Sequence, residues 1–90
     1  MTQVNNNPFI NKYNSLDVHG HTEDMVILPV DEFINDNLKL GKEKIIIIHG
    51  IGERVLSKKI NTHFKNDKRV KNIYLYNENL GMTIIELNML

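Results

Sequence analysis

The spacing of apolar and polar residues predicts a strand followed by a helix in the first half of the chain. Apolar and polar residues alternate over 16–19, as in a short strand with one face on a core. Apolar residues then recur every three or four positions to about residue 40, which predicts an amphipathic helix capped by Thr22 and ended by Gly41. Pro29 lies inside this helix and predicts a kink or a broken first turn, because proline has no backbone N–H. The expected core face of the helix comprises Val26, Val30, Phe33, Ile34, Asn37 and Leu38.

The second half of the chain predicts three strands and a second helix. Residues 44–49 are apolar on both faces, which suits a central strand covered by helices on both sides. Residues 53–65 have helical spacing, and residues 70–76 and 81–87 predict two strands joined as an antiparallel hairpin. The expected core stripe of the second helix, flanked by Val55 and a partly buried His63, comprises Leu56, Ile60 and Phe64.

The order of the predicted elements, β-α-β-α-β-β, indicates a single α/β domain with a four-stranded mixed sheet and two helices. Helical crossovers imply that the first three strands run parallel. The fourth strand is expected to run antiparallel at one edge of the sheet. Residues 1–15 contain five asparagines and little periodicity, which predicts a flexible tail, docked loosely by Phe9, Ile10 and Tyr13, before a domain over 16–90.

Composition narrows the possible functions. The 90 residues include no cysteine, which excludes a disulfide framework, a cysteine zinc site and a thiol nucleophile within this sequence. Apolar runs such as 45–48 do not exceed four residues, which is far too short to cross a bilayer, and no signal peptide is recognisable, so we expect a cytoplasmic protein without membrane contact. The net charge of zero is unevenly distributed: residues 16–36 hold six acids and no base, whereas residues 54–71 hold seven bases and one acid. The basic stretch is either a solvated helix face or a phosphate-binding surface.

Titratable residues stand at the ends of the first two predicted strands. Asp17 and His19 are two positions apart at the end of one strand, and His49 ends the next. Because the carboxyl ends of parallel strands meet at one edge of a sheet, we expect these side chains to line one cleft with the amides of 50–53. There His19 would act as a base, Asp17 would orient it or hold a metal, and His49 would act as an acid or bind phosphate. Alternatively, Asp17 caps a loop and His19 closes the strand by bonding to backbone.

Other chemistry has weaker support. His19, His21 and His49 form a possible metal triad, but the spacing of His21 suits a solvated loop residue better. No Walker motif is present, which argues against an ATPase. Tyr74 and Tyr76 share one face of a strand, where one could stack on a base or both could pack across strands.

Two separate motifs in this order resemble the Smr (small MutS-related) domain family. Leu-Asp-Val-His-Gly stands at 16–20 and His-Gly-Ile-Gly at 49–52, and the ending at 81–87 is similar to the last strand of that family. The resemblance covers residues 16–87. It implies a two-layer βαβαββ sandwich similar to the C-terminal domain of translation initiation factor three. It also implies binding to DNA or RNA, since several members of the family are DNA-nicking or RNA-cleaving endonucleases.

The resemblance assigns roles to individual residues. It implies catalytic roles for Asp17, His19 and His49. The sequence departs from the family where Arg54 replaces a third glycine and Ser57 replaces an arginine, which puts cleavage in question more than binding. The expected phosphate-binding residues are Gly50, Gly52, Arg54, Lys58 and Lys59, with Gly20 and Gly81 as structural glycines.

Three functions remain open at this point. The first is an endonuclease, with no certain cofactor and with Mg²⁺ or Mn²⁺ as the candidates. The second is a non-catalytic module that binds nucleic acid or a ribosome. The third is a protein-interaction domain.

Overall fold

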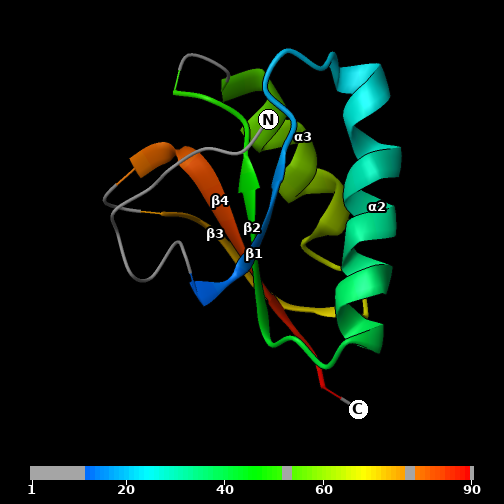
Figure 1. Ribbon diagram of the computed structural model, residues 1–90. Coiled ribbons are helices and arrows are strands. Elements are labelled where there is room, and N and C mark those ends of the chain that lie inside the picture. Colours follow the sequence, from blue (N-terminus) through cyan, green and yellow to red (C-terminus); the bar gives the residue numbers. More distant parts are fainter. Residues whose placement is uncertain (1–11, 52–53, 77–78, 90) are drawn as a thin grey trace.

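The computed structural model describes residues 12–51, 54–76 and 79–89 (Figure 1). Within these ranges it contains β1–β4 and the helices α2 and α3 in the predicted β-α-β-α-β-β order. No helix in these three ranges is long and apolar enough to span a membrane. The elements are β1 (Asn14–Asp17), α2 (Glu23–Lys39), β2 (Lys44–Ile48), α3 (Arg54–Phe64), β3 (Val70–Tyr76) and β4 (Asn79–Leu87).

The four strands form one mixed sheet in the order β1-β2-β4-β3. Strand β2 pairs parallel with β1 and antiparallel with β4, and β4 also pairs antiparallel with β3. The expectation that β4 lies at an edge is therefore wrong, because β4 runs between β2 and β3. Its residues Met82–Ile85 are all buried, whereas much of β3 is exposed. A strand that is apolar on both faces is covered best in the interior of a sheet, which leaves β1 and β3 at the edges.

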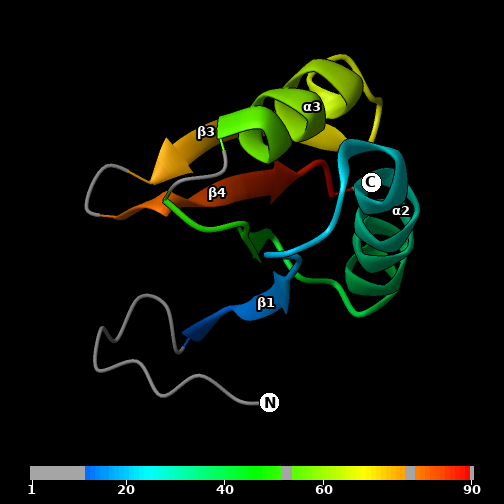
Figure 2. The ribbon, with the colours of Figure 1, turned by 90° about the horizontal axis from the view of Figure 1, so that it is seen from above.

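Both helices pack on the same face of the sheet, so the molecule has two layers (Figures 1 and 2). The expectation of helices on both sides of β2 is therefore wrong. On the helix face, Ile45 and Ile47 belong to a core shared by both helices. On the opposite face, Ile46 packs with Met82 and Ile84, and two partly buried tyrosines, Tyr13 and Tyr76, cover this smaller cluster.

Helix α2 runs unbroken through Pro29 for 17 residues. The buried positions before and after the proline, including Val26 and Val30, hold the helix to the sheet, and this packing outweighs one lost backbone hydrogen bond. At its end, Gly41 has a φ of 72°, and its N–H donates to the Leu38 carbonyl, which confirms the predicted C-cap. At its start, Thr22 occupies the N-cap position but makes no side-chain capping bond.

The first strand begins at Asn14, two residues earlier than predicted, and ends at Asp17. The Asn14 side chain donates to the buried Asn37 of α2 over 2.8 Å, which ties this edge strand to the helix layer. Beyond Asp17, the Val18 N–H still donates to the Ile48 carbonyl over 2.8 Å. Phe9 and Ile10 lie outside the described residues.

Helix α3 buries the predicted stripe of Leu56, Ile60 and Phe64 against the sheet. His63 was expected to be partly buried, but it is exposed, and its ring packs edge-on against Phe64 with 4.7 Å between the centroids. Val55 is also exposed. The difference arises because the sheet covers only a narrow stripe of this helix.

Candidate functional site

Asp17 and His19 form a bonded pair at the carboxyl end of β1. The His19 ring nitrogen Nδ1 lies 2.5 Å from Asp17 Oδ1, and the same oxygen accepts the His19 backbone N–H over 3.0 Å. A carboxylate can only accept, so Nδ1 carries the proton and Nε2 of a neutral ring is left as an acceptor. The His19 side chain is 70% exposed. Within the described residues, Nε2 has no hydrogen-bond partner, so it is open to solvent or to a substrate.

The environment of Asp17 keeps its carboxyl group ionised. Partial burial raises the pKa of Asp17, but hydrogen bonds from the ring and the backbone N–H of His19 outweigh this effect and bring the pKa below its ordinary value. The ionised carboxylate fixes the ring orientation and stabilises a positive charge on it. Gly20 follows directly with a φ of 85°, in the left-handed region where glycine carries no steric cost, so the chain turns immediately after the pair.

His49, at the end of β2, is buried and bonded to β4. Its ring Nε2 lies 2.9 Å from the Thr83 hydroxyl oxygen and Nδ1 lies 3.2 Å from the Gly50 carbonyl. Because a carbonyl only accepts, Nδ1–H donates to Gly50 and Nε2 accepts the Thr83 hydroxyl proton. Burial lowers the pKa of His49 despite the opposing effect of the Gly50 carbonyl, so the ring is neutral at neutral pH.

The backbone of the second motif is also engaged. The N–H groups of His49 and Gly50 both donate to the Gly81 carbonyl, over 2.9 and 3.0 Å. Gly81 therefore fastens this turn to β4, and the Gly50 amide is not available as a phosphate donor. Gly50 has a φ of 93°, as a sharp turn after the strand requires. Gly52 and Glu53, which complete the expected phosphate cradle, lie outside the described residues.

The structure brings the backbones of the two motifs together but separates their side chains. Asp17 is paired with Ile48, whose side chain belongs to the cluster on the face without helices. The His49 ring bonds to Thr83, which is paired with Ile47 of the core on the helix face. His49 is 1% exposed, so its ring does not line an open cleft with the Asp17–His19 pair.

The basic residues of 54–71 fall into two groups: one is held in ion pairs, and the other, in the part of the chain that the structure describes, is at least partly exposed without such partners. Arg69 bonds to Asp67 and Asp31 through contacts of 2.6–2.8 Å and to Asn35 over 2.9 Å, so it joins α2 to the start of β3. The hydrogen bonds that the Arg69 guanidinium donates to Asp67 raise the pKa of Arg69. The bases on α3 have no such partners within the described residues. Arg54 and Lys58 are exposed there, and Lys59 is partly exposed.

The described residues do not form a ready metal site. No group of three or more histidine, aspartate or glutamate side chains in the described ranges is arranged to hold a metal ion. Asp17 is the one carboxylate at the first motif, and its Oδ1 is already bonded to His19. His19 and His49 do not approach as a triad would require, because the His49 ring is turned to Thr83. The residues that the structure describes therefore do not fit a resident Mg²⁺ or Mn²⁺ ion.

Two features of the site were not predicted. Thr83, which holds His49, and Asn61, which faces a groove beside α3, were both missed. The sequence signal for Thr83 is that it is the single polar residue within the apolar run 82–85. Asn61 has no comparable signal in the sequence. The two tyrosines of β3 face the sheet surface without helices, where Tyr74 donates to Glu86 over 2.9 Å and Tyr76 packs on the smaller cluster.

Comparisons with known proteins place this arrangement in a family. A family model described as the Smr domain matches residues 16–88. The chain is 40% identical over 85 residues to "Endonuclease MutS2" of Finegoldia magna, covering 86% of this chain and 11% of that protein. It is 42% identical over 77 residues to "Endonuclease MutS2" of Caldanaerobacter subterraneus, covering 82% and 10%. The chain thus spans about a tenth of the length of these relatives.

A solved structure supports the same assignment. The crystal structure of the Smr domain of Thermus thermophilus MutS2 superposes with a TM-score of 0.79 at 26% identity, covering 83% of this chain and 98% of that one. The match extends over nearly the whole of that domain, so the sheet and both helices are shared. The chain therefore belongs to the Smr domain family, as its two motifs indicated.

Proposed function

We propose that this Smr domain binds nucleic acid and cleaves its phosphodiester backbone with the Asp17–His19 pair. The observation that carries the proposal is the bond between His19 Nδ1 and Asp17 Oδ1, which leaves an exposed imidazole with a free Nε2. Relatives that share the domain are named endonucleases, although their other nine tenths have no counterpart in this chain. The pair is the one exposed acid–base arrangement at the two motifs among the described residues.

The chemistry follows from the geometry of the pair. His19 Nε2 takes the proton from the attacking oxygen, which belongs to water or, in RNA, to the adjacent 2′-hydroxyl. This oxygen forms a bond to phosphorus, and the bond from phosphorus to the leaving oxygen breaks. The Asp17 carboxylate stabilises the imidazolium, which then returns its proton to the leaving oxygen. His49 holds the neighbouring turn through Thr83 and exchanges no proton with the substrate in this scheme.

Binding is assigned to the exposed bases of α3. Arg54, Lys58 and Lys59 stand on the first half of this helix and would contact phosphates without reading sequence. Arg69 is excluded because its guanidinium is bonded to two carboxylates.

The first prediction tests cleavage. Asp17→Asn and His19→Ala should each lower the rate of strand scission by about 10²–10⁴-fold, because general acid–base groups contribute that much. Affinity should be nearly unchanged, since neither residue lies on α3. The measurement is a gel assay with labelled single-stranded RNA, duplex DNA and branched DNA, each with and without Mg²⁺ or Mn²⁺.

His21→Ala is the matched control, because His21 lies on the same turn but outside the bonded pair. It should cut at the wild-type rate. If the wild-type protein binds these nucleic acids but cuts none of them under any condition, the domain is a binding module and the catalytic proposal is wrong. If it binds none of them, the nucleic-acid proposal as a whole is wrong, which leaves the protein-interaction alternative.

A further inference from the structure

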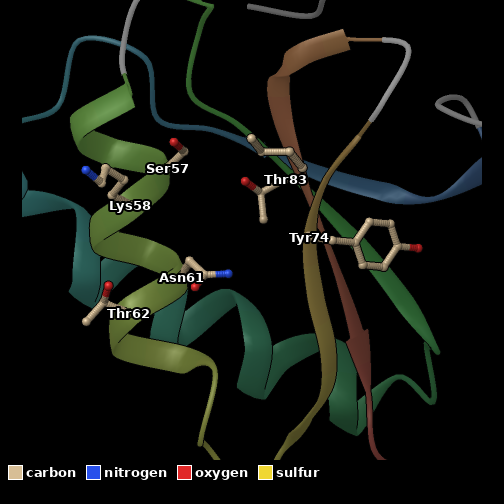
Figure 3. Close-up of a pocket in the computed structure, with 7 residues that line it drawn as sticks. Ser57, Lys58, Asn61, Thr62, Tyr74 and Thr83 are labelled. Carbon is tan, nitrogen blue, oxygen red and sulfur yellow. The ribbon is translucent and has the colours of Figure 1, made fainter.

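A groove of about 360 Å³ lies between α3 and the strands β3 and β4 (Figure 3), and its lining includes neither Asp17 nor His19. It has the size of the smaller ligand sites in proteins, which begin near 300 Å³. Neither sequence motif contributes a residue to it directly. Its lining consists of Ser57, Lys58, Asn61, Thr62, Tyr74, Leu75 and Thr83.

The walls of the groove combine an apolar surface with hydrogen-bonding groups. Leu75 and Thr83 are paired across β3 and β4 and therefore face α3 together. From the opposite side, the Asn61 amide points toward the strands (Figure 3). Asn61 is partly exposed and its amide has no hydrogen-bond partner within the described residues, so two donors and one acceptor are available to a ligand.

His49 sets the hydrogen-bonding character of the floor. The Thr83 hydroxyl donates its proton to His49 Nε2 over 2.9 Å, so its oxygen can only accept from a ligand. The buried histidine of the second motif thus acts as a positioning residue for this groove. Tyr74 lines the groove from β3, with its ring pointing away from α3 (Figure 3).

A positively charged side chain stands on α3 beside the groove, with its ammonium group pointing away from β3 and β4 (Figure 3). Lys58 is exposed and lines both this groove and a second hollow of about 340 Å³ on the other side of α3. Lys59 lines the second hollow. Through Lys58 the groove is therefore continuous with the surface to which phosphate binding was assigned above, where Glu23 is the one acidic side chain lining the second hollow.

We propose that the groove holds one unpaired nucleotide of a bound strand. A nucleobase has apolar faces and a polar edge, which match the Leu75 side chain and the Asn61 amide respectively, while its phosphate lies near Lys58. A duplex does not offer an unpaired base to the groove, because the pairing edges of its bases already bond to each other. This inference rests on the proposed binding of nucleic acid and names the substrate class: strands with unpaired bases.

The second prediction tests the groove. In a His19→Ala background, which keeps the strand intact, Asn61→Ala should weaken binding of a short labelled single-stranded oligonucleotide roughly 3–10-fold, the range for one or two lost hydrogen bonds. Binding of a blunt duplex of the same sequence should not change. Alanine favours helix, so the variant should fold. Asn66→Ala, in the exposed turn after α3, is the matched control and should bind both ligands as its parent does.

The outcomes separate the groove from the proposed function. If Asn61→Ala loses nothing, or loses equally on the duplex, the groove does not hold an unpaired nucleotide. If Lys58→Ala with Lys59→Ala still weakens binding in that case, the proposed nucleic-acid binding stands and the groove proposal alone is wrong. If the His19→Ala protein binds neither ligand, both proposals are wrong.

Discussion

The carboxyl ends of β1 and β2 look alike in sequence but differ in structure. Each strand is followed within two residues by a histidine and then by a glycine with a positive φ, and the two backbones are joined by the bond from the Val18 N–H to the Ile48 carbonyl. At the first end, His19 is exposed and bonded to a carboxylate beside it. At the second, His49 is buried and bonded to a hydroxyl on a different strand.

The position of each strand in the sheet explains the difference. Strand β1 is at an edge, so the turn after it has one neighbouring strand and its side chains reach solvent. Strand β2 is interior, and the turn after it is fastened to β4 by two backbone bonds to Gly81. The two motifs therefore differ in role. The motif at the edge strand exposes the Asp17–His19 pair to solvent, whereas the motif at the interior strand stabilises the turn after β2 and orients Thr83 in the groove.

The third prediction contrasts the two histidines in stability. His49→Ala should lower the free energy of unfolding by about 3 kcal/mol, because it opens a buried cavity and leaves the Thr83 hydroxyl without its partner. His19→Ala should change it by less than about 0.5 kcal/mol, as is usual for an exposed side chain. Urea unfolding of both variants measures the difference. Equal decreases in the free energy of unfolding for the two variants would contradict the difference in burial between His19 and His49.

The fourth prediction applies the same contrast to the bases. Arg69→Met should cost about 1 kcal/mol of stability, because it removes a partly exposed network with Asp31 and Asp67, and should leave the salt dependence of nucleic-acid binding unchanged. Lys58→Ala with Lys59→Ala should do the reverse, reducing the slope of log affinity against log salt by about one to two units. Salt titrations and thermal melting distinguish the two variants. A reduced slope for Arg69→Met would place this arginine at the interface, and an unchanged slope for the lysine pair would remove the lysines from it.

Much of the fold could be predicted because its signals are local. The bounds of β3 match the prediction at 70–76, and the spacing of Leu56, Ile60 and Phe64 gave the buried stripe of α3. The Gly41 cap depends on one residue and its neighbours. The placement of β4 between β2 and β3 depends instead on pairing between distant segments, and no periodicity encodes which strands become neighbours.

The site was less predictable for the same reason. Asp17 and His19 bond over two positions of sequence, so their proximity could be read from a strand alone. The burial of His49 follows from the place of β4, since its partner Thr83 is 34 positions away. Arg69 was grouped with the open bases by sequence, although its guanidinium is bonded to Asp67 and to Asp31, which is 38 positions earlier.

The division between the two motifs is tested most directly by the protonation of His49. Burial lowers the pKa of His49, so the unfolded chain takes up a proton more readily than the folded one. The free energy of unfolding therefore decreases as pH falls below about 6.5. Side-chain ¹⁵N NMR of the histidines across a pH titration reports the charge and the tautomer of each ring. The structure predicts that His49 stays neutral, with its proton on Nδ1, at pH values where an ordinary histidine is already protonated. A His49 that protonates at or above the ordinary pH range, or that carries its neutral-state proton on Nε2, would contradict the account.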